Sequence, residues 1–102
     1  PLHQFFLNMN TIHLRTYDAP VISFSHFLPR RDLLPAREHL KFKGLPRVAG
    51  CQALDLQIRA MPSIAHVFGH SHINLDRVID GINYVQNAIR TPNERDGSPP
   101  PI

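Results

Sequence analysis

The sequence predicts a mixed fold in which amphipathic helices alternate with short apolar strands. Three observations support this class. Apolar residues recur at helical spacing in 2–16 and 50–61, short apolar runs fill 21–25 and 64–68, and alternating segments flank turn residues between 76 and 85. A chain of 102 residues with 42% hydrophobic residues can form one small domain with a thin core.

The first expected element is an amphipathic helix over residues 2–16. Its apolar side chains recur every three or four residues and form one stripe: Leu2, Phe5, Phe6, Met9 and Ile12. Such a stripe normally faces the core, so we expect the helix to lie against the strands. Pro20 ends the pattern because proline disfavours helical backbone at the residue before it. Residues 21–25 follow as a buried strand.

A loop and a second helix are expected next. Pro35, Gly44 and Pro46 make a long regular element improbable between residues 33 and 50, which we read as loop. Residues 50–61 then form a helix, because four side chains share one face: Cys51, Leu54, Ile58 and Met61. Asp55 and Arg59 are spaced i, i+4 on that helix, which predicts an ion pair.

The C-terminal part of the chain is expected to hold a strand, an antiparallel pair and a tail. Residues 64–68 read as a buried strand that ends at Gly69. Residues 73–75 continue briefly beyond the Gly-His-Ser-His segment, and two alternating segments between residues 76 and 85 are separated by turn residues, as in an antiparallel pair. Residues 91–102 contain four of the chain's prolines and are predicted to form a flexible tail.

Histidines stand where both predicted single strands end. His26 follows the strand at 21–25, and His70 and His72 follow the strand at 64–68 and Gly69. Glycine allows a sharp turn, so His70 and His72 can lean toward one point at the edge of a sheet. Three imidazoles at strand ends predict a metal site made of His26, His70 and His72.

These segments resemble the last two metal motifs of the calcineurin-like metallophosphoesterase superfamily. The resemblance rests on Ser25-His26, on Gly69-His70-Ser71-His72 and on the segment 80–86, and it extends over residues 5–95. It implies an α/β fold that is part of a four-layer α-β-β-α sandwich, with mixed sheets and flanking helices. Residues 1–90 would be the C-terminal half of such a domain, and 91–102 its tail.

The resemblance also implies an activity. Members of the superfamily hydrolyse phosphomonoesters or phosphodiesters at a dinuclear centre of divalent ions such as Mn, Fe, Zn or Ni, with the ions about 3.5–4 Å apart. His26 and His70 would bind one ion and His72 the other. The substrate would be a phosphate ester, and no residue of this chain is assigned as a catalytic acid or base.

The upstream motifs of the superfamily, Asp-x-His, Gly-Asp-x-x-Asp and Gly-Asn-His, do not occur in this sequence. We therefore expect this chain alone to be inactive, to bind metal weakly or not at all, and to depend on an N-terminal half or another chain for carboxylate ligands. One alternative is a catalytically inactive phosphoesterase-like subunit of a larger assembly. Another is a small zinc module, which would need a fourth ligand.

Other residues carry weaker signals. His66 alternates into the strand, which favours a structural position over one that orients a ligand, whereas His3, His13 and His39 are expected at the surface. Arg30 is read as an exposed loop arginine, with phosphate binding as the alternative. The net charge of +3 favours a solvated basic face over anion steering or nucleic-acid binding.

The location of the protein can be predicted only coarsely. A single cysteine cannot form an internal disulfide, which favours a reducing compartment. No apolar run reaches the roughly 20 residues of a membrane span, so no membrane partner is expected. The chain is predicted to be intracellular, with the cytoplasm first and an organelle as the alternative.

Overall fold

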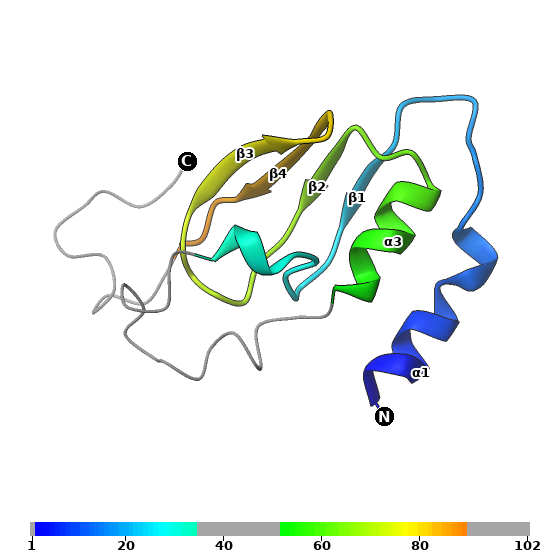
Figure 1. Cartoon of the computed structure of the whole chain (residues 1–102), viewed down its shortest axis with the longest axis horizontal. Coiled ribbons are helices and arrows are strands. Elements are labelled where there is room, and N and C mark those ends of the chain that lie inside the picture. The colour runs from blue at the N-terminus through cyan, green and yellow to red at the C-terminus, as the bar shows by residue number, and fades with distance from the viewer. Residues whose placement is uncertain (1, 35–51, 90–102) are drawn as a thin grey trace, which may run out of the picture.

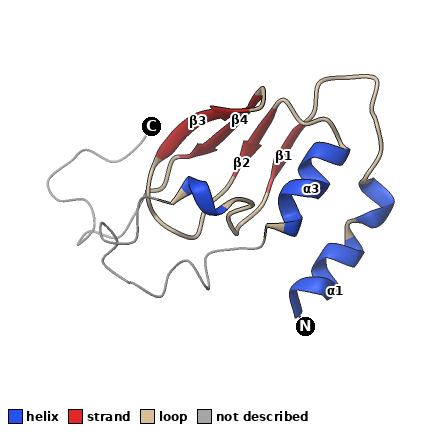
Figure 2. Cartoon of the chain, in the orientation of Figure 1, coloured by secondary structure: helices blue, strands red, loops and turns tan. Residues whose placement is uncertain are grey.

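The computed structural model describes residues 2–34 and 52–89. The described elements, in chain order, are α1 (Leu2–Met9), the 3₁₀-helix η1 (Thr11–His13), β1 (Ile22–Phe24), the 3₁₀-helix η2 (Arg31–Leu33), α3 (Ala53–Ala60), β2 (Ala65–Val67), β3 (Leu75–Ile79) and β4 (Ile82–Gln86). Helices and strands are thus combined around one sheet, which is an α/β arrangement (Figure 2).

The four strands form one mixed sheet in the order β1-β2-β4-β3 (Figure 1). β1 pairs with β2, and β2 with β4, in parallel, whereas β3 pairs with β4 in antiparallel orientation. The carboxyl ends of β1, β2 and β4 therefore lie at the same edge of the sheet. In open sheets with parallel strands this is the edge at which ligands bind.

The predicted antiparallel pair is confirmed. β3 and β4 pair from Leu75 opposite Gln86 to Ile79 opposite Ile82. The two residues between the strands, Asp80 and Gly81, both have positive φ, at 51° and 80°. A two-residue turn with this backbone matches the twist of a hairpin, and Asp-Gly is a favoured sequence for it.

The core lies between α3 and one face of the sheet. Its buried members come from α3, from the segments after β1 and β2, and from β4: Leu28, Leu33, Ile58, Phe68, Ile82 and Tyr84. The predicted helix over 50–61 is confirmed as α3. Ile58 of α3 and Tyr84 of β4 are almost completely buried, so these two elements supply the most buried side chains of the core.

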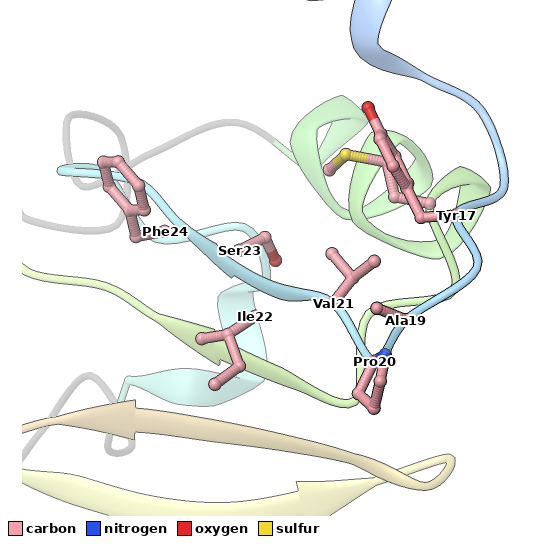
Figure 3. Close-up of a pocket in the computed structure, with 8 residues that line it drawn as sticks. Tyr17, Ala19, Pro20, Val21, Ile22, Ser23 and Phe24 are labelled. Atoms are coloured by element: carbon pink, nitrogen blue, oxygen red, sulfur yellow. The ribbon is translucent and has the colours of Figure 1, made fainter.

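The opposite face of the sheet is open in the described part of the chain. Ile22 and Phe24 of β1 are 66% and 84% exposed, and Val67 of β2 is also exposed. Successive side chains of a strand point to opposite faces, so only Ser23 of β1 and His66 of β2 turn toward α3. The prediction of a strand buried throughout at 21–25 is therefore wrong. An open pocket of about 450 Å³ lies along β1 and the residues before it (Figure 3).

The N-terminal helix differs most from the prediction. α1 ends at Met9, and η1 replaces the rest of the expected helix. α1 lies beside α3, away from the sheet (Figure 1), and the Gln57 side chain donates a hydrogen bond of 2.8 Å to the Leu7 carbonyl. All five side chains of its apolar stripe are exposed and only Leu7, outside that stripe, is buried, so the prediction that the stripe packs against the strands is wrong.

Some predictions fall outside the described residues. They concern the loop at 35–50, Cys51, His39 and the tail at 91–102. Within 2–34 and 52–89, the helices are too short and too polar to cross a membrane.

Candidate functional site

The histidines after β1 and β2 meet at the carboxyl edge of the sheet. The pairing of the two strands continues into these segments, because Ser25 N–H donates to the Val67 carbonyl and Gly69 N–H donates to the His26 carbonyl, each at 2.9 Å. The continued pairing brings two side chains together across 44 positions of sequence. His26 Nε2 lies 3.1 Å from His70 Nδ1.

This separation suits two ligands of one metal ion. Imidazole nitrogens bind transition metals at about 2.0–2.1 Å, so two ligands at an angle between about 90° and 110° lie about 2.8–3.4 Å apart. The observed 3.1 Å falls in this range. In the absence of metal, one of the two nitrogens carries a proton and donates it to the other. The donor set of two neutral imidazoles fits Zn, Mn, Fe or Ni.

Phe27 completes a small aromatic cluster at this edge. Its ring centroid lies 4.9 Å from that of His26 and 4.8 Å from that of His70, and the two imidazole centroids are 5.0 Å apart. The apolar ring restricts the orientations of both imidazoles and limits water on one side of the pair. The pair is therefore held by packing as well as by its own hydrogen bond.

The backbone at His70 is strained. Its φ is 69°, and Ser71 N–H donates to the Gly69 carbonyl at 2.8 Å across it, which forms a γ-turn of the rare type. His72 also has a positive φ, of 59°. Residues without the freedom of glycine seldom adopt this backbone, and those that do cluster at functional sites.

Gly69 does not make the sharp turn that was predicted for it. Its φ is not positive, so His70 rather than Gly69 makes the sharp turn. A Cβ at position 69 would lie 3.4 Å from the His26 carbonyl oxygen and 3.7 Å from His26 Nδ1. Both are ordinary van der Waals distances, so a small side chain at position 69 would fit beside the His26 ring.

The structure brings together two of the three predicted ligands. His72 is exposed, and its position is not part of a triad with His26 and His70. Across residues 2–34 and 52–89, no three histidine, cysteine, aspartate or glutamate side chains are grouped so that they could hold a metal ion. The described residues thus supply a pair of nitrogen ligands and no carboxylate.

Gln86, which the sequence analysis did not single out, holds the loop that carries His70. It is buried at the end of β4. With its amide nitrogen toward the loop, the side chain donates to Ser71 Oγ at 3.0 Å and to the Gly69 carbonyl at 3.1 Å. Its oxygen accepts from the backbone N–H groups of His72 and Ile73 at 2.9 and 3.2 Å. These four bonds offset the strain of the turn.

His66 occupies the buried position that its alternation in the strand predicted. It is 1% exposed. Its Nδ1 lies 2.7 Å from Ser23 Oγ and its Nε2 lies 2.8 Å from Ser25 Oγ. Burial lowers the pKa of His66 to about 4, because a charged imidazolium would lose its hydration there. The ring is therefore neutral at pH 7.

Arg30 is not the exposed loop residue that was expected. It forms a bidentate pair with Asp32 at 2.9 and 2.8 Å and a third bond to Asp55 at 3.1 Å. The hydrogen bond to Asp32 raises the pKa of Arg30 and lowers that of Asp32. Its donors serve two carboxylates, which disfavours the alternative of phosphate binding. His3 and His13 are exposed, as predicted.

Comparisons with known proteins support the fold. No family model matches the chain, and no curated protein matches it. The crystal structure of phosphopantetheinyl hydrolase (PptH) from Mycobacterium tuberculosis is similar, with a TM-score of 0.75 and 21% sequence identity. The match covers 94% of this chain and 34% of that chain. The chain thus spans about a third of the length of that enzyme, and at this identity the likeness shows the fold alone.

This result corrects the family prediction. The similar solved structure is that of a phosphopantetheinyl hydrolase, and no family model places the chain in the calcineurin-like metallophosphoesterase superfamily. That assignment is therefore withdrawn, together with the phosphatase activity and the inactive phosphoesterase-like subunit that were inferred from it. The physical reason is that a Gly-His-x-His segment specifies a turn bearing two histidines, and such a turn does not by itself fix a reaction.

Proposed function

We propose that this chain is a segment of a hydrolase that acts on a substrate bearing a phosphopantetheinyl group. We further propose that His26 and His70 bind a divalent metal ion in its active site. The fold likeness to the phosphopantetheinyl hydrolase supports the reaction class. The observation that carries the site is the 3.1 Å separation of His26 Nε2 and His70 Nδ1 at the carboxyl edge of the sheet.

The two imidazoles would hold the ion and leave its other positions to further ligands, water and substrate. A bound divalent ion supplies a Lewis acid for a phosphoryl or carbonyl oxygen and lowers the pKa of bound water. The residues of this chain fix where the ion lies, because the strained turn and the Gln86 hydrogen bonds hold His70 while the paired strand ends hold His26. His72, next in the same loop, is proposed as a ligand of a second ion.

Carboxylate ligands are proposed to come from another polypeptide segment. Two neutral nitrogens do not neutralise a dication, so the chain by itself should bind such ions weakly. A second sheet is proposed to pack over the open face formed by Ile22, Phe24 and Val67, which gives a four-layer sandwich. The exposure of these apolar side chains supports this arrangement.

Metal binding tests the proposed site directly. The full 102-residue chain is titrated with Co²⁺ and followed by visible absorption and calorimetry. His26→Ala and His70→Gly should each weaken binding at least about 10-fold, since even loss of a residue that only supports a ligand costs that much. Glycine at position 70 also relieves the positive φ, so weaker binding could not be attributed to added backbone strain.

His13→Ala is the matched control, because it removes an exposed histidine elsewhere in the chain. It should leave Co²⁺ affinity unchanged. Equal affinity of wild type, His26→Ala and His70→Gly would refute the site.

A separate experiment tests the proposed reaction. The native protein is incubated with a peptide bearing a phosphopantetheinyl group, and released phosphopantetheine is measured by mass spectrometry. No release above background would refute the proposed substrate.

The sandwich is tested with Phe24→Asp, which places a charge on the open face. The native protein should lose several kcal/mol of stability, because a charge would be buried between the sheets. The isolated 102-residue chain, in which Phe24 is 84% exposed, should change little. Equal effects on the two forms, measured by urea denaturation, would count against a second sheet on this face.

A further inference from the structure

A chain of buried hydroxyl and imidazole groups runs beneath the loop that carries His26. Ser63 Oγ lies 3.0 Å from Ser23 Oγ, which lies 2.7 Å from His66 Nδ1. On the other side of the ring, His66 Nε2 lies 2.8 Å from Ser25 Oγ, which donates a 2.7 Å hydrogen bond to the Phe27 carbonyl. Ser23, Ser63 and His66 are all buried.

The hydrogen bonds determine where the single ring proton of His66 resides. A carbonyl can only accept a hydrogen bond, so the single proton of the Ser25 hydroxyl is donated to the Phe27 carbonyl. Ser25 Oγ must then accept from His66 Nε2–H. Nδ1 of the neutral ring is left as an acceptor for the Ser23 hydroxyl. Ser63 then donates to Ser23 Oγ at 3.0 Å in place of its 3.1 Å bond to the Ile58 carbonyl, which keeps the Ser63 N–H as a donor. The other tautomer would instead give up the shorter 2.7 Å bond from Ser25 to the Phe27 carbonyl. Every contact of His66 is thereby satisfied by one tautomer.

This arrangement acts on the segment 25–27, which has His26 at its centre. Ser25 N–H is bound to the Val67 carbonyl and the His26 carbonyl to Gly69 N–H, each at 2.9 Å. Within the segment, the Ser25 hydroxyl donates a hydrogen bond to the Phe27 carbonyl. His66, 40 positions from His26 in sequence, contacts that hydroxyl at 2.8 Å.

We propose that His66, as its Nε2–H tautomer, is a positioning residue that acts through Ser25 to aim the His26 imidazole at His70. The proposal rests on the proposed function in that the pair is the metal site. His66 touches neither the metal position nor the reacting atoms. Its contribution is to remove alternative orientations of the 25–27 segment, as second ligand shells do in metal proteins.

Two pairs of variants of the 102-residue chain test this role. Ser25→Ala removes the acceptor for His66, whereas Ser25→Thr keeps a hydroxyl. His66→Phe keeps a ring without hydrogen bonds, whereas His66→Gln keeps an N–H donor. Ser25→Ala and His66→Phe should weaken Co²⁺ binding about 10-fold, and the conservative partner of each should stay within about 3-fold of wild type.

A second readout separates this proposal from the proposed function. In the metal-free chain, the nuclear Overhauser effect between the His26 and His70 rings reports their proximity, and ¹⁵N shifts report the His66 tautomer. Wild type should show the contact and the Nε2–H form, and Ser25→Ala should lose the contact. If wild type binds no Co²⁺ but keeps the contact, the metal site fails and the positioning role stands. An Nδ1–H tautomer, or variants that unfold at lower temperature yet keep both Co²⁺ affinity and ring contact, would overturn the proposal.

Discussion

Replacement of Asp55 by alanine is expected to lower the free energy of unfolding by about 3–5 kcal/mol, the usual cost of removing one partner from a buried ion pair. The Asp55 side chain is 10% exposed. Its carboxylate binds three elements at once, because it accepts from Tyr84 of β4 at 2.5 Å, from Arg59 of α3 at 2.8 Å and from Arg30 before η2 at 3.1 Å.

The titration behaviour of this cluster agrees with its role. Burial alone would raise the pKa of Asp55, but the hydrogen bonds from Tyr84 and Arg59 outweigh burial and hold the pKa below its ordinary value. Burial and the bond to Asp55 raise the pKa of Tyr84. Alanine at position 55 would leave a completely buried phenol without its acceptor, and Arg30 and Arg59 would keep only their exposed partners, Asp32 and Asp80. Each of these losses is costly in a domain of this size.

Asp32→Ala is the matched control. It removes a carboxylate that also pairs with Arg30, but the Asp32 side chain is 52% exposed, so the loss should be under about 1 kcal/mol. Tyr84→Phe is a milder variant that should cost about 1.5–3 kcal/mol, the worth of a hydrogen bond to a charged group. Urea denaturation followed by far-ultraviolet circular dichroism measures all three. Similar losses for Asp55→Ala and Asp32→Ala would show that burial does not govern this cluster.

Local sequence patterns predicted most of the elements. The spacing of apolar residues located α3, the short apolar runs located β1 and β2, and the Asp80-Gly81 pair located the hairpin. The i, i+4 pairing of Asp55 with Arg59 was also predicted and is present at 2.8 Å. These features depend on residues close in sequence, so local rules are sufficient for them.

Long-range contacts were predicted less well. An apolar stripe predicts that one face of α1 packs against another element, but it does not indicate that α1 lies beside α3 instead of the sheet. Strand ends indicated that His26 and His70 could meet, because parallel strands share an edge. Nothing local indicated that Gln86 would hold the His70 turn, or that Tyr84 and Arg30 would share Asp55. Such contacts arise only from tertiary packing.

Acid should destabilise the chain through His66 before the carboxylates titrate. The pKa of His66 falls from its ordinary value of 6.5 to about 4 on folding, because burial disfavours the charged ring. Between these two values the unfolded chain binds more protons than the folded chain, so stability rises with pH. The contribution is therefore fully present above pH 6.5 and is lost as the pH falls toward 4. Its size is about 3 kcal/mol.

The His66→Gln variant should remove this dependence. Its absolute stability is expected to be lower at pH 7, but its free energy of unfolding should change less than that of wild type between pH 6.5 and 4. Asp32 and Asp55, whose folded pKa values are lowered, lose their contributions only below that window. His13→Gln, at an exposed site, should keep the wild-type slope. Urea denaturation at several pH values gives the free energy of unfolding of each variant. If this free energy changes with pH in the same way for wild type and His66→Gln, the ring is hydrated or charged in the folded chain. A charged ring would carry protons on both nitrogens. Ser25 would still accept from Nε2–H and donate to Phe27, but Ser23 would have to turn its hydroxyl from His66 to Ser63.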